Sequence, residues 1–201
     1  GPGGTIPLRF YRPVDSEPDS LLLFIHGGGW VLGGIESADP VAASLFAATG
    51  ALVVSPGYRL APEHPFPAAP DDVLAAYAWI QRELAGDRPV FVSGDSAGGN
   101  LAAVLCLDAR EKKLRLPAGQ ILFYPVTDLT RTDRPSYETF AKGFILDRAD
   151  MEWFISLYAP DASSRKDPRA SPLLAPELSG LPPALVFTAA FLAARTKCCN
   201  S

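Results

Sequence analysis

The sequence predicts an α/β fold with a mostly parallel sheet and helices on both of its faces. Short apolar runs alternate with helical patterns along most of the chain, as they do in proteins built from strand–helix–strand units. The run at residues 21–25 is continuously apolar and precedes a glycine cluster, which is typical of a strand buried on both faces. Hydrophobic residues make up 48% of the chain, enough for a full core.

The expected elements follow one another with few interruptions. We predict strands at residues 6–11, 21–25, 51–55, 89–93, 119–126 and 184–189. We predict helices at residues 40–49, 71–84, 97–110 and 148–158. The first helix is expected to have Asp39 as its N-cap and Pro40 at its first helical position, with Gly50 ending it. Outside its one helix, the proline-bearing segment 127–181 is expected to be irregular.

Length, charge and hydropathy exclude several kinds of protein. The chain has 201 residues, which predicts a single domain. Its net charge of −4 gives no electrostatic reason to bind phosphates, so nucleic acid is excluded as a partner. The sequence contains no run of about 20 apolar residues, and its start has no leader pattern, so we expect no membrane span and a cytoplasmic location.

Metal and disulfide chemistry are not expected either. The chain has two histidines and three cysteines, too few for a convincing metal-ligand cluster or a disulfide framework. Cys106 lies in an apolar run and is expected to be a buried thiol. We therefore predict neither a cofactor nor a metal ion.

The most specific motif lies at residues 94–98, which read Gly-Asp-Ser-Ala-Gly. This G-x-S-x-G pattern stands between an apolar strand and an alanine-rich helix, where it presents a serine hydroxyl on a sharp turn. Small neighbours let the strand and the helix approach each other. The helix N-terminus offers backbone N–H groups and a positive dipole end to a developing oxyanion. Ser96 is therefore the candidate nucleophile.

A second motif, at residues 26–30, reads His-Gly-Gly-Gly-Trp and directly follows the predicted strand at 21–25. Its glycines leave the backbone bare, so N–H groups can point into a cleft, as in the loop that completes the oxyanion hole of lipases and esterases. A phosphate-binding loop is a weaker interpretation, because the chain has no G-x-x-x-x-G-K-[ST] pattern. The two motifs together favour acyl-transfer chemistry.

With these motifs the chain resembles the hormone-sensitive-lipase family of α/β-hydrolase carboxylesterases. The resemblance extends over about residues 6–188 and includes the segments 58–68, 124–126 and 171–173. It implies an α/β-hydrolase fold and hydrolysis of a small apolar ester through a serine acyl-enzyme. It also implies Ser96 as the nucleophile and His26 as a residue that sets the glycine loop. The implied oxyanion donors are the backbone N–H groups of Gly28, Gly29 and Ala97.

The chain departs from the family pattern after Ser96. Family members carry a catalytic aspartate just after the strand predicted here at 184–189, and a histidine farther on. This chain has Leu192 near the place of the acid and no histidine after Ser96. His64 is expected to be an ordinary loop residue. A serine nucleophile needs a base, so the resemblance implies an impaired esterase.

The same comparison implies an incomplete, C-terminally truncated domain over residues 1–201. The family's last strands and most of its N-terminal cap are missing, and residues 127–181 are expected to be a partly cap-like insertion. Residues 196–200 read Thr-Lys-Cys-Cys-Asn and do not resemble the family. A one-base shift of the reading frame would produce them from codons for a family-like acidic stretch, and we hypothesise such a frameshift.

Two other interpretations stay open. One is a non-catalytic small-molecule binding protein of the same fold, as in the plant gibberellin receptors, which have lost the catalytic histidine. The other is a homo-oligomer that forms through the exposed sheet edge, because unpaired strand edges invite pairing with another chain. Trp30, Phe140 and Phe144 are candidates for lining the acyl pocket, although aromatic residues more often belong to the core.

Overall fold

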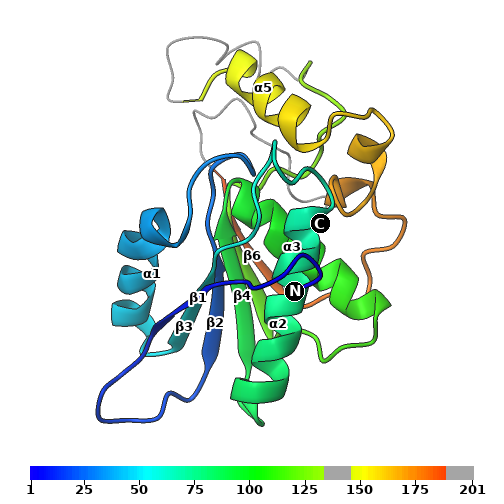
Figure 1. Ribbon diagram of the computed structural model, residues 1–201. Coiled ribbons are helices and arrows are strands. Elements are labelled where there is room, and N and C mark those ends of the chain that lie inside the picture. Colours follow the sequence, from blue (N-terminus) through cyan, green and yellow to red (C-terminus); the bar gives the residue numbers. More distant parts are fainter. Residues whose placement is uncertain (134–145, 189–201) are drawn as a thin grey trace.

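The computed structural model describes residues 1–133 and 146–188, which build one six-stranded sheet (Figure 1). The strand order is β1-β3-β2-β4-β5-β6. Strand β1 (Leu8–Tyr11) runs antiparallel to β3 (Leu52–Pro56) at one edge. The remaining pairs are parallel and join β3, β2 (Leu21–Ile25), β4 (Val90–Asp95), β5 (Gly119–Phe123) and β6 (Ala184–Phe187). The predicted mostly parallel sheet is confirmed.

Helices cover both faces of this sheet (Figure 1). Helix α1 (Ile35–Thr49) packs on one face. Helices α2 (Ala68–Ile80) and α3 (Ala97–Glu111) pack on the other, and α2 continues into a π-helical turn, η1 (Gln81–Ala85). Helix α5 (Arg148–Tyr158) lies beyond the carboxyl ends of the parallel strands, and two short 3₁₀ turns follow it, η2 (Ser164–Lys166) and η3 (Pro172–Leu174).

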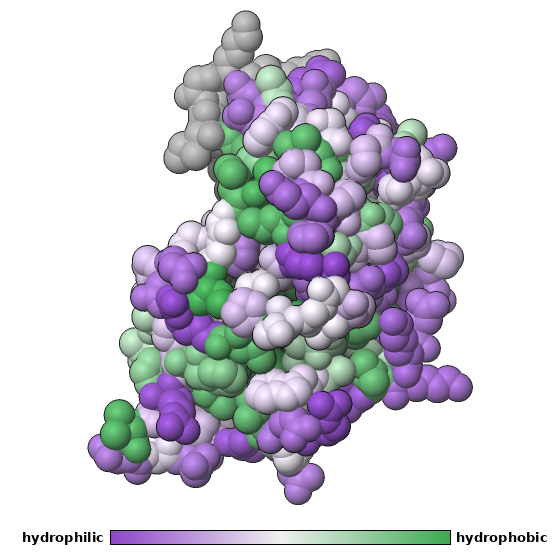
Figure 2. Space-filling view, in the orientation of Figure 1, coloured by the Kyte–Doolittle hydropathy of each residue, from purple (hydrophilic) through white to green (hydrophobic). Residues whose placement is uncertain are grey.

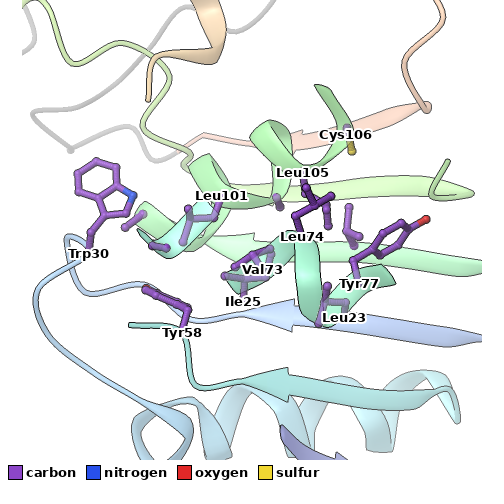
Figure 3. Close-up of a cluster of buried hydrophobic side chains, with 14 of the residues drawn as sticks. Leu23, Ile25, Trp30, Tyr58, Val73, Leu74, Tyr77, Leu101, Leu105 and Cys106 are labelled. Atoms are coloured by element: carbon purple, nitrogen blue, oxygen red, sulfur yellow. The ribbon is translucent and has the colours of Figure 1, made fainter. Parts of the chain in front are cut away.

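The alternation of side chains along β2 explains the two cores. Leu21, Leu23 and Ile25 point to the face covered by α2 and α3, where they join the larger hydrophobic cluster. Figure 3 labels Leu23 and Ile25 in this cluster. Leu22 and Phe24 point to the opposite face and pack against α1. Because both faces are covered, every residue of this strand is buried, which is why its sequence is continuously apolar.

Helix α1 begins five residues before the predicted start at Pro40. Its N-cap is Gly34, and the Ser37 hydroxyl accepts a hydrogen bond of 2.9 Å from the Gly34 N–H. Asp39, the predicted cap, instead accepts hydrogen bonds from the Arg9 guanidinium at 3.0 Å and the Tyr11 hydroxyl at 2.7 Å. The prediction was wrong because Asp39 has charged and hydroxyl partners on β1, and the helix tolerates Pro40 inside it.

Two further boundaries differ from the predictions. Strand β5 ends at Phe123 rather than at residue 126, because Tyr124 has a φ of 36°, outside the strand region. Helix α2 begins at Ala68, three residues before the predicted start, since a proline such as Pro70 is tolerated in the first turn. The other predicted strands and helices appear within two residues of their expected ends, except that residue 189 lies outside the described residues.

Polar contacts fasten the irregular segment after β5 to the helices. The Asn100 side chain, on α3, donates hydrogen bonds to the carbonyl oxygens of Val126 at 2.6 Å and Ala170 at 2.9 Å. Arg169 forms ion pairs with Asp108 of α3 at 2.9 Å and Asp71 of α2 at 2.7 Å. These contacts fix the chain that carries α5 against the sheet domain.

Candidate active site

The predicted nucleophile occupies a strained turn. Ser96 lies between the end of β4 and the start of α3 and has φ 53° and ψ −115°, a conformation that side-chain-bearing residues rarely adopt. Its N–H donates to the Phe123 carbonyl at 2.9 Å, and its carbonyl accepts from the Asn100 N–H at 3.0 Å. The backbone on both sides of the strained residue is therefore held by hydrogen bonds.

Close packing around this turn requires small residues. A Cβ at Gly98 would collide with the backbone carbonyl of Ile25 on β2, and a Cβ at Gly94 would collide with the backbone of Gly98. The first turn of α3 thus lies directly against the ends of β2 and β4. This contact brings the serine turn next to the glycine loop that follows β2.

The backbone of Gly28 and Gly29 in the glycine loop has an unusual conformation. Gly28 has a φ of 113° and Gly29 a φ of 60°, and both residues are half-buried. Within the described part of the chain, neither N–H donates a hydrogen bond to another group. The loop is instead closed by the N–H groups of Val31 and Leu32, which donate to the Gly28 carbonyl at 3.1 and 2.8 Å.

A third N–H group belongs to Ala97. This residue is fully buried and is the first residue of α3, so its N–H has no carbonyl partner inside the helix. The positive end of the helix dipole lies at the same place.

Ser96 and the glycine loop share one pocket of about 420 Å³, which we call the Ser96 pocket. Its lining is mostly apolar and consists of Gly28, Gly29, Trp30, Ser96, Tyr124, Val126, Leu146, Met151 and Phe154. Figure 2 shows hydrophobic surface between the segment that carries α5 and the body of the molecule below it. A pocket of this kind suits a small apolar ligand with few polar groups.

Helix α5 forms one wall of the Ser96 pocket. Its residues Met151 and Phe154 line the pocket, and the Phe154 ring lies so close to Gly29 that a Cβ there would overlap it. One turn farther on, Tyr158 stacks on Trp30 with ring centroids 4.5 Å apart and planes at 4°. The helix therefore holds the glycine loop from the outside as well as closing the pocket.

The back of the glycine loop contacts three polar side chains. The Nδ1 of His26 contacts the Gly27 carbonyl at 2.7 Å, and because a carbonyl only accepts, this nitrogen carries the proton. The Tyr58 ring stacks on His26 at 4.3 Å, and its hydroxyl donates to the His26 carbonyl at 2.9 Å. The Gly27 N–H donates to Asp95 at 2.9 Å. These contacts agree with the expectation that His26 sets the loop.

Burial shifts the pKa values of the three side chains behind the loop. Burial lowers the pKa of His26, although its contact with the Gly27 carbonyl and the charge of Asp95 act in the opposite direction. Burial also raises the pKa of the Asp95 carboxyl, opposed by the hydrogen bond from the Gly27 N–H. The pKa of the Tyr58 hydroxyl is raised for the same reason, and Asp95 adds to it.

A second cavity of about 300 Å³, which we call the rear cavity, lies on the other side of the loop. It is lined by Phe24, His26, Gly27, Gly28, Leu32, Gly33, Ser37, Ala38, Val41 and Asp95. Gly28 lines both cavities, so the loop is the partition between them.

Neither histidine lines the Ser96 pocket. His26 is buried behind the loop. His64 is exposed on the segment between β3 and α2, where its backbone N–H donates to the Leu60 carbonyl. The expectation for His64 thus agrees with its place. Leu192, the residue near the expected acid position, lies outside the described residues.

The structure brings together most of the predicted site residues. Ser96, Gly28 and Gly29 line one pocket together with Trp30, while Phe140 and Phe144 lie outside the described residues.

Sequence reasoning missed other lining residues. Tyr124 lies just beyond the carboxyl end of β5, the edge where parallel sheets bind ligands. The sequence did not indicate this position, because the strand is predicted to continue to residue 126. Met151 and Phe154 lie on the apolar side of the predicted helix at 148–158, together with Ile155 and Tyr158. This pattern predicted that the side is buried, but not which part of the molecule it packs against.

Cys106 is fully buried, as expected, and burial raises the pKa of its thiol to about 12. In the described ranges, no group of three or more His, Cys, Asp or Glu side chains is placed to hold a metal ion. None of the helices in those ranges is long and apolar enough to cross a membrane.

Relatives of this chain are named as ester hydrolases. It is 45% identical over 201 residues to the carboxylic ester hydrolase LipN of Mycobacterium tuberculosis, with 95% of this chain and 53% of LipN covered. It is 40% identical to an ethyl acetate hydrolase of Pseudomonas putida, with coverage of 93% and 61%. The chain therefore spans between half and two thirds of the length of these relatives. Their names give no support to the alternative of a non-catalytic binding protein.

Solved structures agree with the sequence matches. An esterase from Pyrobaculum calidifontis superimposes with a TM-score of 0.91 at 41% identity, covering 97% of this chain and 66% of the esterase. The family model described as alpha/beta hydrolase fold matches residues 22–197, most of the sequence. With the strand–serine–helix turn, the glycine loop and the mostly parallel sheet in place, these matches show that the chain belongs to the α/β-hydrolase fold family.

Proposed function

We propose that this protein hydrolyses carboxylic esters through an acyl-enzyme formed on Ser96. The observation that carries the proposal is the Ser96 pocket, which the serine lines together with Gly28 and Gly29, whose N–H groups donate to no other group within the described ranges. A nucleophile and preorganised hydrogen-bond donors for the oxyanion are two of the requirements of acyl transfer.

The residues support the following sequence of steps. The Ser96 oxygen attacks the ester carbonyl, and the N–H groups of Gly28, Gly29 and Ala97 stabilise the negative charge on the carbonyl oxygen. The bond to the alcohol breaks, and the alcohol leaves with the proton that the serine gave up. Water then attacks the acyl-enzyme, releasing the carboxylic acid and restoring the serine hydroxyl.

The size and lining of the Ser96 pocket favour small apolar esters. A volume of about 420 Å³ is near the lower end of ordinary ligand pockets. Met151 and Phe154 offer apolar contact next to Gly29. We therefore propose short acyl or small aryl esters as substrates.

We further propose that turnover by residues 1–201 alone is slow. Proton removal from a serine normally uses an imidazole, and the sequence has no histidine after Ser96. His26 uses Nδ1 to hold the Gly27 carbonyl, and it lines the rear cavity rather than the Ser96 pocket. Binding and the oxyanion donors alone provide an acceleration of about 10³–10⁴ over water in proteases that lack a triad member.

Two measurements test these proposals. A p-nitrophenyl phosphonate ester should label Ser96, forming a serine–phosphorus bond as p-nitrophenolate leaves, and mass spectrometry of the digested protein locates the label. Release of p-nitrophenolate from p-nitrophenyl acetate should be slow and should fall to the buffer rate in Ser96→Ala. Ser44→Ala, on the outer side of α1, is the matched control. Equal rates in Ser96→Ala and wild type would contradict catalysis at Ser96.

A further inference from the structure

The direction of the Gly28 N–H is set by the peptide unit to which it belongs. That unit also contains the Gly27 carbonyl, and in a planar trans peptide the C=O and N–H bonds point in opposite directions. The His26 Nδ1–H holds the Gly27 carbonyl at 2.7 Å. Holding this carbonyl behind the loop directs the Gly28 N–H the other way, away from His26.

The preceding peptide unit, between His26 and Gly27, is held at both of its ends. The Tyr58 hydroxyl donates to the His26 carbonyl at 2.9 Å, and the Gly27 N–H donates to the Asp95 carboxylate at 2.9 Å. Tyr58 comes from the segment after β3 and Asp95 from the end of β4. Two elements distant in sequence thus fix one peptide.

Asp95 fits tightly against the loop. A Cβ at Gly27 would overlap the Asp95 carboxylate, so the absence of a side chain there lets the carboxylate reach the N–H. Asp95 directly precedes Ser96 and is the last residue of β4. A single side chain therefore connects the strand that carries the nucleophile to the loop that carries the oxyanion donors.

The carboxylate does not line the Ser96 pocket. It lines the rear cavity, together with Gly27 and Val41. A substrate in the Ser96 pocket is separated from Asp95 by the glycine loop itself. Any effect of Asp95 on the reaction must therefore pass through the position of the loop.

We propose that Asp95 is a positioning residue of the oxyanion hole. By accepting the Gly27 N–H, it holds the loop at the distance from Ser96 at which Gly28 and Gly29 can bind the oxyanion. The inference rests on the proposed function of the Ser96 pocket, and it assigns to Asp95 a task that the serine and the glycines do not perform.

The test compares three variants with wild type. Asp95→Asn keeps an oxygen that accepts the Gly27 N–H and removes the charge. Asp95→Ala removes the acceptor. Val41→Ala enlarges the same rear cavity without changing a polar contact and is the matched control. The probe is the p-nitrophenyl phosphonate, and its maximal labelling rate at Ser96 is measured separately from its half-saturating concentration.

The maximal labelling rate of Asp95→Ala is expected to fall by about 10- to 100-fold, because small misplacements of catalytic groups cost up to about 10²-fold. Its half-saturating concentration should stay near the wild-type value, since the Ser96 pocket keeps its lining. Asp95→Asn and Val41→Ala should label at rates close to wild type. A merely structural role would lower the thermal stability of Asp95→Ala but leave its maximal labelling rate near the wild-type value.

A second measurement is independent of reactivity. In ¹⁵N-labelled protein, hydrogen exchange of the Gly27 amide is expected to accelerate in Asp95→Ala and to stay slow in Asp95→Asn and Val41→Ala. If wild type fails to label at Ser96, the proposed function fails, while the exchange rates still decide the role of Asp95. Unchanged exchange in Asp95→Ala, or an equal loss of labelling in Asp95→Ala and Asp95→Asn, would overturn the inference.

Discussion

Backbone strain in single residues is concentrated around the Ser96 pocket. Four non-glycine residues in the described ranges have a positive φ, and three of them, Trp30, Ser96 and Tyr124, line this pocket. Such conformations cost of order 1–3 kcal/mol each and persist only where surrounding contacts enforce them. Here the enforcing contacts include the hydrogen bond from the Ser96 N–H to Phe123 and the stacking of Trp30 on Tyr158.

The lowered pKa of His26 predicts a loss of stability in mild acid. An unfolded histidine titrates near pH 6.5, so between about pH 7.5 and 5.5 the unfolded chain takes up more protons at this residue than the folded one. The free energy of unfolding should therefore decrease over this range. In His26→Asn, which keeps a donor for the Gly27 carbonyl but does not titrate, the decrease should be smaller.

Urea unfolding at several pH values measures this difference, with His64→Asn as the control for the other histidine. The raised pKa values of the buried carboxyls Asp95 and Asp108 oppose the histidine effect at lower pH. Because both carboxyls are present in every variant, the comparison isolates His26 to first order. Parallel curves for wild type and His26→Asn would show that the ring does not need to be neutral.

At the residue scale, the sequence indicated the groups that lie next to each other in a motif. Ser96, Gly28 and Gly29 were predictable because a sharp turn and a bare backbone each need particular residues at adjacent positions. The contact between Asp95 and Gly27 was not, since it joins residues 68 positions apart. The local sequence around Gly27 does not indicate which distant side chain packs into the space that a Cβ would occupy.

At the scale of elements, α5 stabilises the glycine loop through one aromatic pair. Tyr158 is fully buried and stacks on Trp30, but its hydroxyl has no hydrogen-bond partner among the described residues. Tyr158→Phe should therefore change the free energy of unfolding by less than about 1 kcal/mol. Tyr158→Ala removes the ring and should cost about 3–5 kcal/mol.

Urea denaturation followed by tryptophan fluorescence measures both values. The phosphonate labelling rate at Ser96 should fall in Tyr158→Ala and stay near wild type in Tyr158→Phe, because the loop depends on the ring rather than the hydroxyl. If phenylalanine proved as damaging as alanine, the hydroxyl would have to take part in a contact that the stacking does not explain.

A second element-scale contact is the ion-pair group around Arg169. The Asp108 side chain is only 2% exposed, whereas those of Arg169 and Asp71 are 25% and 31% exposed. Arg169→Ala leaves Asp108 buried without its partner, and we expect a loss of about 2–3 kcal/mol, somewhat less than for fully buried pairs. Asp71→Asn should cost under about 1 kcal/mol, since its pair is partly exposed.

The double variant Arg169→Ala/Asp108→Asn completes the test. Removing both charges should recover part of the stability, because no unpaired carboxylate is then buried. Urea unfolding of the single and double variants gives the coupling between the two residues. Additive losses would mean that the two side chains act independently.

The boundaries of elements were harder to predict than their existence. The pair Asp39-Pro40 has the form of a helix start, and on local preference alone a helix should begin there. The helix begins earlier because Asp39 bonds Arg9 and Tyr11, residues about 30 positions away. The bounds of β2, in contrast, could be predicted from its continuously apolar sequence, because a central strand is covered on both faces.

At the scale of the whole molecule, β6 forms one edge of the described sheet. Its only neighbour within the described residues is β5, and Leu185 and Phe187 are 55% and 46% exposed. Unpaired edges promote association with further strands. We therefore expect the protein to self-associate as its concentration rises, and Leu185→Lys to weaken this association. Light scattering coupled to size-exclusion chromatography measures it, and a monomer at every concentration would contradict the prediction.

The glycine loop separates the Ser96 pocket from the rear cavity. Substitutions in the two cavities are therefore expected to have different effects on the proposed reaction. A substitution at Phe154 changes the lining of the Ser96 pocket and is therefore expected to alter which ligands the pocket accepts. Changes at Val41 or Ser37 reach only the hidden side of the glycines. If Ser96 acts as proposed, the rate would therefore be tuned through Asp95, which holds Gly27 from the rear cavity while the lining of the Ser96 pocket stays unchanged.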